Sequence, residues 1–218
     1  MYAYSENFIL VLSHDEVVHL KCSMLGKMPG DREDKFANLK LAYAYMCGHP
    51  GKKLLFMGQE FGQWNEWSEK RALDWYLLED DSHKELKDFT KACLILNKKY
   101  RCLYETDYSP KGFRWINAND KDNSVFSFIR ISPDKKRHLL FVFNFTPVER
   151  PNHRIGVPVK GKYKLVLGDD MKNQKKTLTS VRGECDGYKE SLLIDLHRYG
   201  IAVYEFNGDV NAHKPTNI

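Results

Sequence analysis

The sequence predicts an α/β segment followed by an antiparallel β-sandwich. Two observations predict it: short apolar runs alternate with helical periodicity over the first hundred residues, and a series of short strand patterns separated by turn residues follows. A chain of 218 residues is long enough for one large domain or two modest ones. We expect the α/β portion over 1–107, the β-sandwich over 108–208, and a flexible tail over 209–218.

The first predicted element is a strand over 8–12. Its sequence, Phe-Ile-Leu-Val-Leu, is a continuous apolar run, which is typical of a strand buried on both faces of a parallel sheet. Ser13, His14, Asp15 and Glu16 follow directly. Substrates bind at the carboxyl ends of the strands in parallel α/β folds, so these side chains are candidates for one wall of an active site. The alternative is that they are only a polar loop start and a helix cap.

Two helices and one more strand follow. Residues 31–47 have helical periodicity with Asp31 as N-cap, and the glycines and proline of 48–51 end that helix. A short buried strand is expected over 54–57. A second helix is expected over 82–99, where Ser82 and Glu85 fit a capping box. The apolar residues on the inner faces of the two helices are Phe36, Leu39, Tyr43, Met46, Cys47, Leu86, Phe89, Cys93, Leu96 and Tyr100.

The loops between these elements have unequal lengths. The strand-to-helix loops, 13–30 and 58–81, are long, whereas the helix-to-strand connection over 48–53 is short. This is the pattern of a (β/α)₈ barrel (TIM barrel), in which the strand-to-helix loops build the catalytic face. Two units cannot close a barrel of eight. The units therefore form either a small open sheet or the last part of a barrel whose other units are encoded elsewhere.

The pattern of predicted elements changes after about residue 108, from alternating strands and helices to strands alone. Six strands are expected, at 113–116, 125–129, 139–143, 163–167, 191–194 and 201–206, with turn residues between them. Short strands with frequent turns predict an antiparallel β-sandwich of about a hundred residues. Residues 100–112 are the expected junction.

Composition excludes several classes of protein. The net charge is +5, but the basic residues form scattered doublets, so a nucleic-acid interface is not expected. The five cysteines are odd in number and form no C-x-x-C, which predicts free thiols in a reducing compartment. Neither a signal peptide nor an apolar run of about 18 residues is present, so we expect a cytoplasmic protein that does not bind membranes.

His14 and Asp15 suit a sugar ligand better than other chemistry. An aspartate can accept hydrogen bonds from sugar hydroxyls and stabilise developing positive charge, and a histidine can donate to a hydroxyl. A serine-protease relay is excluded because Ser13, His14 and Asp15 are adjacent on one strand. His14 and His19 lack a metal-site pattern, and the glycines form no phosphate-binding loop. We therefore expect neither a metal nor a cofactor.

The loop over 58–81 combines aromatic rings with amide and carboxylate groups. Flat rings beside fixed polar groups suit sugars, so Glu60, Trp64 and Trp67 are candidate substrate-binding residues, together with Glu16. For any single ring, packing of the loop onto the fold is an equally open alternative. Trp75 is expected to be such a packing anchor.

Several strings resemble a known family. They are Leu-Ser-His-Asp-Glu-Val-Val-His at 12–19, Gly-Lys-Lys-Leu-Leu-Phe-Met-Gly-Gln-Glu-Phe at 51–61, Tyr-x-Pro-x-Gly-Phe-x-Trp at 108–115 and Asn-Phe-Thr-Pro-Val at 144–148. With the Ser-Glu-Asn-Phe string at 5–8, they resemble the C-terminal part of the bacterial 1,4-α-glucan (glycogen) branching enzymes of the α-amylase superfamily. The resemblance covers nearly the whole chain. Leu20 departs from it, because the family usually has glycine there, and Cys22 and Gln59 are smaller departures.

The resemblance implies a fold and roles for residues. The chain would comprise the last two βα units of a (β/α)₈ barrel and the C-terminal β-sandwich domain. Asp15 matches the family's third catalytic carboxylate, which stabilises the transition state, and His14 matches a histidine that contacts the same sugar. The substrate would be an α-1,4-glucan such as glycogen, and the reaction a retaining transfer that forms α-1,6 branches.

The resemblance also implies that the machinery is incomplete. The family keeps its nucleophile and its acid/base on earlier barrel strands, and neither motif has a counterpart here. We expect the isolated chain to be inactive and to associate with the remainder of the barrel or with itself. Two other functions remain open: another glycoside hydrolase of the same superfamily, and a non-catalytic glycan-binding or scaffold module.

Overall fold

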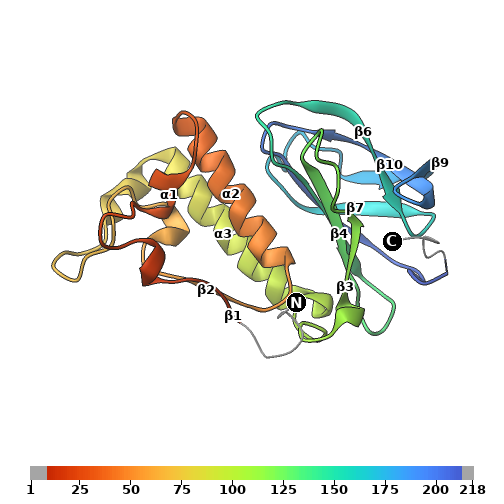
Figure 1. Cartoon of the computed structure of the whole chain (residues 1–218), viewed down its shortest axis with the longest axis horizontal. Coiled ribbons are helices and arrows are strands. Elements are labelled where there is room, and N and C mark those ends of the chain that lie inside the picture. The colour runs from red at the N-terminus through yellow and green to blue at the C-terminus, as the bar shows by residue number, and fades with distance from the viewer. Residues whose placement is uncertain (1–8, 213–218) are drawn as a thin grey trace.

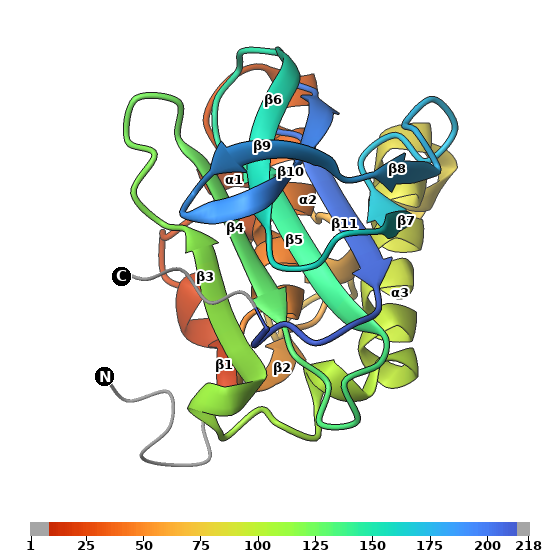
Figure 2. The same ribbon diagram turned by 90° about the vertical axis from the view of Figure 1, so that its right-hand side faces the viewer.

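The molecule is built in layers around one large sheet. The structure is a computed structural model that describes residues 9–212. Helices α2 (Arg32–Gly48) and α3 (Asp81–Lys99) lie against one side of a six-stranded sheet, and a three-stranded sheet covers the other side (Figures 1 and 2). The short helix α1 (Met24–Lys27), which the sequence did not predict, packs against α2.

A separate two-stranded sheet lies outside the sandwich, beside the helices (Figure 1). Strands β1 (Ile9–Leu12) and β2 (Lys52–Leu55) pair in parallel, with Leu12 opposite Leu55. The prediction that the first strand is buried on both faces is wrong for the described residues, because Ile9 is 53% and Val11 46% exposed. Among residues 9–212, β2 is the only strand that pairs with β1. Phe8, the first residue of the predicted strand, lies outside the described residues.

The two long helices form much as predicted, with one corrected cap. The Asp31 carboxylate accepts a hydrogen bond from Asp34 N at 2.9 Å and caps α2. Asp80, not Ser82, caps α3, because its carboxylate accepts from Ser82 N at 2.9 Å. The predicted capping box is therefore wrong, and Glu85 instead pairs with a lysine of α2. The second strand also ends two residues earlier than predicted.

The second half is an antiparallel β-sandwich, as predicted. Its strands are β3 (Phe113–Asn117), β4 (Val125–Arg130), β5 (His138–Asn144), β6 (Arg150–Val157), β7 (Lys162–Gly168), β8 (Thr177–Thr179), β9 (Val181–Cys185), β10 (Tyr188–Leu196) and β11 (Ile201–Phe206). The larger sheet has the order β3-β4-β5-β11-β7-β8 and the smaller sheet the order β6-β10-β9. The six predicted strands are confirmed, and β6, β8 and β9 are additional.

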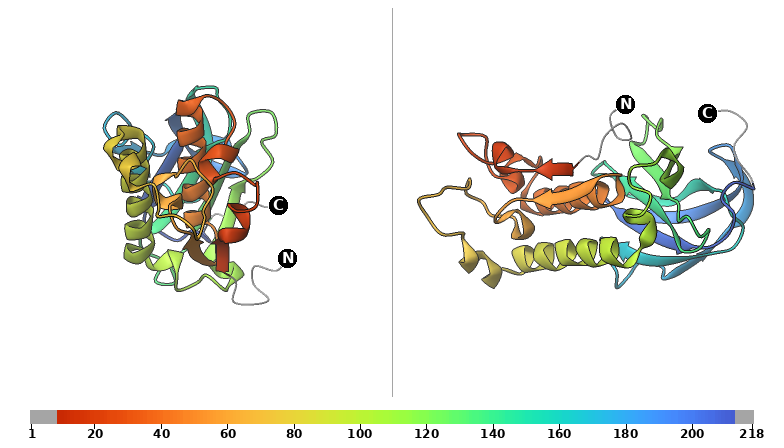
Figure 3. Two further views of the ribbon diagram at one scale, coloured as in Figure 1. Left: turned by 90° about the vertical axis from the view of Figure 1, so that its left-hand side faces the viewer. Right: turned by 90° about the horizontal axis from the view of Figure 1, so that it is seen from below.

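Both faces of the large sheet are buried, so every residue of β5 is buried. One face packs on the small sheet, and the other packs on α2 and α3. Gly48, the last residue of α2, lies so close to the sheet that a Cβ atom there would come within 2.8 Å of the Phe141 ring. The helices and the large sheet therefore share one apolar core. Figure 3 shows the helices beside the sandwich.

Packing continues past residue 208, where a tail was expected. Val210 is 1% exposed and belongs to the sandwich core, and Arg114 Nη1 donates to its carbonyl at 2.7 Å. The sequence did not reveal this because a single valine among polar residues gives no periodic pattern. Residues 213–218 lie outside the described residues.

Candidate functional site

His14 and Asp15 lie at the carboxyl end of β1. A 3₁₀ turn over His14–Glu16 follows the strand directly, and the Ser13 hydroxyl caps it by accepting from Asp15 N at 3.4 Å. The two side chains are open to solvent, at 58% and 71% exposure, and His14 Nε2 lies 3.2 Å from Asp15 Oδ1. The turn therefore presents an imidazole and a carboxylate side by side. The polar cap, which was the alternative interpretation, and the candidate site are thus formed by the same short segment.

The loop from Val17 to Ser23 follows this turn in an unusual conformation. His19, Leu20 and Cys22 all have positive φ angles, at 57°, 66° and 65°. Non-glycine residues adopt this left-handed region at an energetic cost, and such residues cluster at functional sites. Leu20 is 96% exposed, so no packing contact of its side chain holds it there.

Glu66 binds this loop from a distant part of the sequence. Its Oε2 accepts from Leu20 N at 3.1 Å, and its Oε1 accepts from Cys22 N at 2.6 Å. Next to it, Trp67 N donates to Val17 O at 3.1 Å. Glu66 was not predicted as a site residue, because a contact across more than forty residues leaves no local signal.

The two tryptophan candidates lie in different places. Trp67 packs against Phe56 with ring centroids 5.2 Å apart. The Phe56 ring also lies near the His14 ring, with centroids 6.0 Å apart. Because β1 and β2 are parallel, the residues after both strands meet at one edge, which brings Trp67 to the His14 side. Trp64 instead packs against Phe36 of α2 and His83 of α3.

Trp75 does not have the packing role expected of it. Its side chain is 54% exposed and its ring lies against Phe61, at 5.1 Å between centroids. The neighbouring Tyr76 is 64% exposed. The expectation of a packing anchor is therefore wrong for the structure as described, and Phe61, which is fully buried, anchors the loop instead.

Glu16 is half-buried beside the candidate site. Its Oε2 atom is buried and has no hydrogen-bond partner among the described residues, and its backbone carbonyl accepts from Lys27 Nζ.

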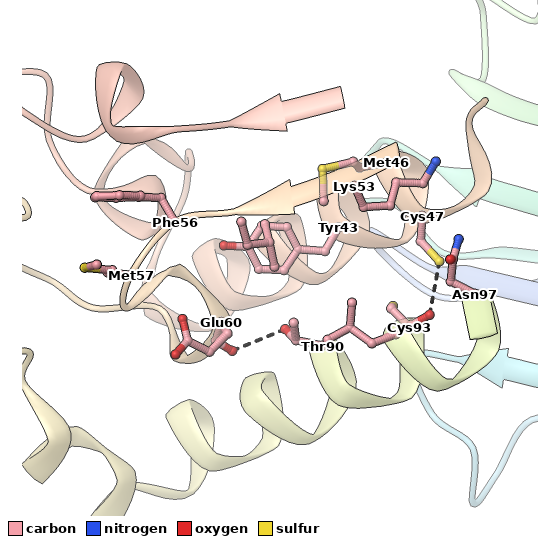
Figure 4. Close-up of a pocket in the computed structure, with 12 residues that line it drawn as sticks. Tyr43, Met46, Cys47, Lys53, Phe56, Met57, Glu60, Thr90, Cys93 and Asn97 are labelled. Atoms are coloured by element: carbon pink, nitrogen blue, oxygen red, sulfur yellow. Dashed lines mark hydrogen bonds between the residues drawn. The ribbon is translucent and has the colours of Figure 1, made fainter. Parts of the chain in front are cut away.

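Glu60 lies in a separate cavity of about 400 Å³ between β2, α2 and α3 (Figure 4). Burial and the nearby Glu60 charge raise the pKa of Tyr43, and burial lowers the pKa of Lys53 to about 8. Phe56 lines this cavity as well as contacting His14. The cavity is lined by Tyr43, Met46, Cys47, Lys53, Leu55, Phe56, Met57, Glu60, Thr90, Cys93, Leu94 and Asn97.

The arrangement suits contacts with sugar hydroxyls. Asp15 can only accept hydrogen bonds when ionised, and His14 can donate to one hydroxyl while its other nitrogen accepts. Asp15 and Glu16 are adjacent in one turn, so nothing places them on opposite sides of a glycosidic bond, as retaining hydrolysis requires of its two carboxylates. Within residues 9–212, no three histidine, cysteine, aspartate or glutamate side chains gather to hold a metal ion.

Comparisons with known proteins find a matching family and similar enzymes. Residues 115–207 match the family described as the alpha amylase, C-terminal all-beta domain. A 1,4-alpha-glucan branching enzyme GlgB of Butyrivibrio fibrisolvens is 50% identical over 212 residues, which are 94% of this chain and 33% of that protein. The same enzyme of Thiobacillus denitrificans (strain ATCC 25259 / T1) is 54% identical over 173 residues, 78% of this chain and 23% of that protein.

The fold likewise resembles a solved structure. The crystal structure of AmyP in complex with maltose has a TM-score of 0.57, at 12% identity, over 88% of this chain and 38% of that one. At that identity the likeness concerns the fold alone. The chain spans about one third or less of the length of the curated relatives above. No helix within residues 9–212 is both long and apolar enough to cross a membrane.

Proposed function

Because this chain is a relative of the C-terminal part of the bacterial 1,4-α-glucan branching enzymes, we propose that it forms one wall of a glucan-transferring active site. In that reaction an α-1,4-glucan segment is cut and rejoined through an α-1,6 bond, as in glycogen synthesis. The observation that carries the proposal is the turn after β1, which holds His14 and Asp15 together at the carboxyl end of a parallel strand.

In this proposal Asp15 stabilises the transition state. The positive charge that develops on the sugar ring lies against its carboxylate, while the same oxygens accept hydrogen bonds from ring hydroxyls. His14 donates to a neighbouring hydroxyl and helps to fix the sugar. Glu16 and Trp67 border this place, whereas Glu60 and Trp64 act on the glucan further along its length.

The catalytic fold is completed by chain outside this sequence. We propose that residues 1–107 are the last two βα units of a (β/α)₈ barrel and that residues 108–208 are its C-terminal β domain. The exposed edges and apolar faces of β1 and β2 support this division, since a barrel would cover them. The partners are then the remainder of the barrel and an α-1,4-glucan. We place the enzyme in the cytoplasm, which suits its five free cysteines.

The isolated chain is expected to have no branching or hydrolytic activity. Retaining transfer needs a nucleophile and an acid about 5–5.5 Å apart, and the adjacent carboxylates of the turn cannot provide that pair. The measurement is the iodine absorbance of amylose incubated with the pure chain, together with analysis of branch points. A reproducible fall in absorbance, or new α-1,6 linkages, would contradict the expectation.

A chimera tests the proposed role of Asp15. The matching third of the Butyrivibrio fibrisolvens enzyme is replaced by this chain, and the chimera is expected to branch amylose. Asp15→Asn in the chimera should lower kcat by about 10²–10³-fold, the usual effect of removing one electrostatic stabiliser. Glu69→Gln, an exposed carboxylate in the loop, is the matched control and should leave kcat unchanged. An Asp15→Asn chimera that is as active as the parent would disprove the role.

A further inference from the structure

Glu66 lies where it can control the shape of the candidate site. The loop that it holds begins one residue after the turn that carries His14 and Asp15. We propose that Glu66 is a positioning residue, which holds the loop over 17–23 in its left-handed conformation and thereby fixes the turn that presents Asp15. The inference rests on the proposed function of that turn and adds a residue to it.

The Glu66 carboxylate binds two backbone N–H groups of the loop. The backbone N–H groups of Leu20 and Cys22 converge on the two oxygens of one carboxylate, at 3.1 and 2.6 Å. Backbone N–H groups that converge in a turn containing left-handed residues form a concavity that favours an anion, which suits a carboxylate. Hydrogen bonds to a charged acceptor are stronger than neutral ones, so this contact can offset the cost of the backbone conformation.

Glu66 is itself held in place. Arg71 Nη2 donates to the Glu66 carbonyl at 2.7 Å, and the next residue, Trp67, donates its N–H to Val17 O at 3.1 Å. Val17 and Trp67 are both substantially buried, so the backbone on each side of the contact is anchored. The carboxylate therefore acts from a fixed position and does not merely follow the loop.

Lys21 links the loop to Asp15. Between the two residues that Glu66 binds lies Lys21, and its Nζ donates to the Asp15 carbonyl at 2.9 Å. The loop thus folds back onto the turn, and its backbone at 20–22 decides where Lys21 can reach. Freeing the loop removes this contact and lets the turn move, and an error of about 1 Å in the position of a catalytic group can cost about 100-fold in rate.

The residue at position 20 determines how strongly the loop conformation depends on the Glu66 contact. Leu20 has a φ angle of 66° with a fully exposed side chain, a conformation that glycine adopts without cost. A leucine there makes the loop depend on the Glu66 contact more than a glycine would. Leu20→Gly should therefore compensate in part for the loss of Glu66.

The first experiment uses the chain itself and does not depend on its activity. Cys22 N is the nitrogen of the Lys21–Cys22 peptide bond, so Glu66 holds the bond that trypsin would cleave. Glu66→Ala is expected to raise the initial rate of cleavage after Lys21 at least about tenfold. Glu69→Ala is the matched control. Cleavage after the fully buried Arg130 reports global unfolding and should stay slow in both variants.

The second experiment uses the chimera described above. Glu66→Ala should lower kcat about 10-fold or more while KM changes less than about twofold, because the substrate contacts remain and transition-state stabilisation is lost. Glu66→Ala combined with Leu20→Gly should recover part of kcat, which a general loss of stability would not explain. Glu69→Ala should behave as the parent.

The outcomes separate this inference from the proposed function. Unchanged cleavage after Lys21 in Glu66→Ala overturns the inference even if the chimera branches glucan normally. Faster cleavage with an unchanged kcat also overturns it, since the loop would then be held without effect on Asp15. A parent chimera without branching activity overturns the proposed function and the catalytic role of Glu66 together, while the cleavage result still reports the contact.

Discussion

At the scale of single residues, the most consequential contact outside the candidate site is a buried ion pair. Arg130 and Asp107 are 0% and 1% exposed, with Nη2 and Oδ1 2.7 Å apart. Arg130 also donates to the carbonyls of Gly48 and Gly112, so its charge is fully coordinated where α2, the junction and β4 meet. Nothing in the local sequence marks this pair, because its members lie 23 residues apart in segments of different structure.

Breaking this pair should be severe. Asp107→Ala leaves an uncompensated guanidinium in the core and is expected to lower the free energy of unfolding by about 3–5 kcal/mol. Asp209→Ala removes an exposed partner of Lys135 and should cost less than about 1 kcal/mol. Urea unfolding followed by circular dichroism measures both. Equal effects of the two variants would contradict this account of the junction.

His49 should make stability depend on pH. Burial, followed by the charges of Lys53 and Arg130, lowers its pKa to about 4, from an ordinary value of 6.5. The unfolded chain then binds the proton more readily than the folded one, so stability is complete above about pH 6.5 and is lost as the pH falls toward 4. After allowance for partial exposure, we expect a loss of about 2 kcal/mol over this range.

The check for His49 is a comparison of pH profiles. Unfolding free energies at pH 7 and pH 4.5 are measured for the parent and for His49→Phe, which keeps an aromatic ring among Tyr45, Phe113, Trp115 and Phe128. The variant should lose less stability on acidification. Parallel profiles would mean that other groups cause the acid sensitivity.

At the scale of elements, the long helices and the apolar strands followed their patterns, whereas three polar edge strands did not. Both long helices and the six apolar strands were predictable because one face of each is continuously buried. Strand β6 was missed because its first five residues are polar or proline and largely exposed, and β8 and β9 are short and polar. Asp80 caps α3 because its backbone is extended, whereas Ser82 already lies within the helix.

The contact between α2 and the sheet should tolerate no added atom. In an exposed helix, replacing glycine with alanine stabilises by up to about 1 kcal/mol. Gly48→Ala should instead destabilise by about 1–3 kcal/mol, because its Cβ would come within 2.8 Å of the Phe128 and Phe141 rings, both fully buried. Ala42→Gly, at a half-buried position of the same helix, controls for propensity alone. A Gly48→Ala variant with an increased unfolding free energy would exclude the close approach.

At the scale of the whole molecule, the sandwich is closed and the α/β half is open. The sandwich buries both faces of its large sheet. In the α/β half, apolar side chains of β1, β2, the loop after β2 and the outer face of α3 remain exposed: Ile9, Val11, Leu54, Met57, Leu94 and Ile95. Exposed apolar surface of this kind marks a contact with further protein.

The isolated chain should therefore associate. Sedimentation velocity is expected to show oligomers that grow with concentration in the micromolar range, together with binding of an apolar dye. Val11→Lys with Leu94→Lys should reduce both, whereas Leu193→Lys, at an exposed site on the sandwich, should not. A parent chain that stays monomeric at about 100 µM would argue against an uncovered face.

The order of the long helices and the apolar strands, the sandwich and the position of His14 and Asp15 after the first strand were determined by the sequence alone. Each depends on local periodicity, turn residues and adjacency, which a single sequence displays. Only the tertiary structure decided the exposure of β1, the anchoring of the loop by Glu66, and the ion pair between Asp107 and Arg130. These depend on which distant segments meet, and burial is a property of that meeting, not of any one stretch of residues.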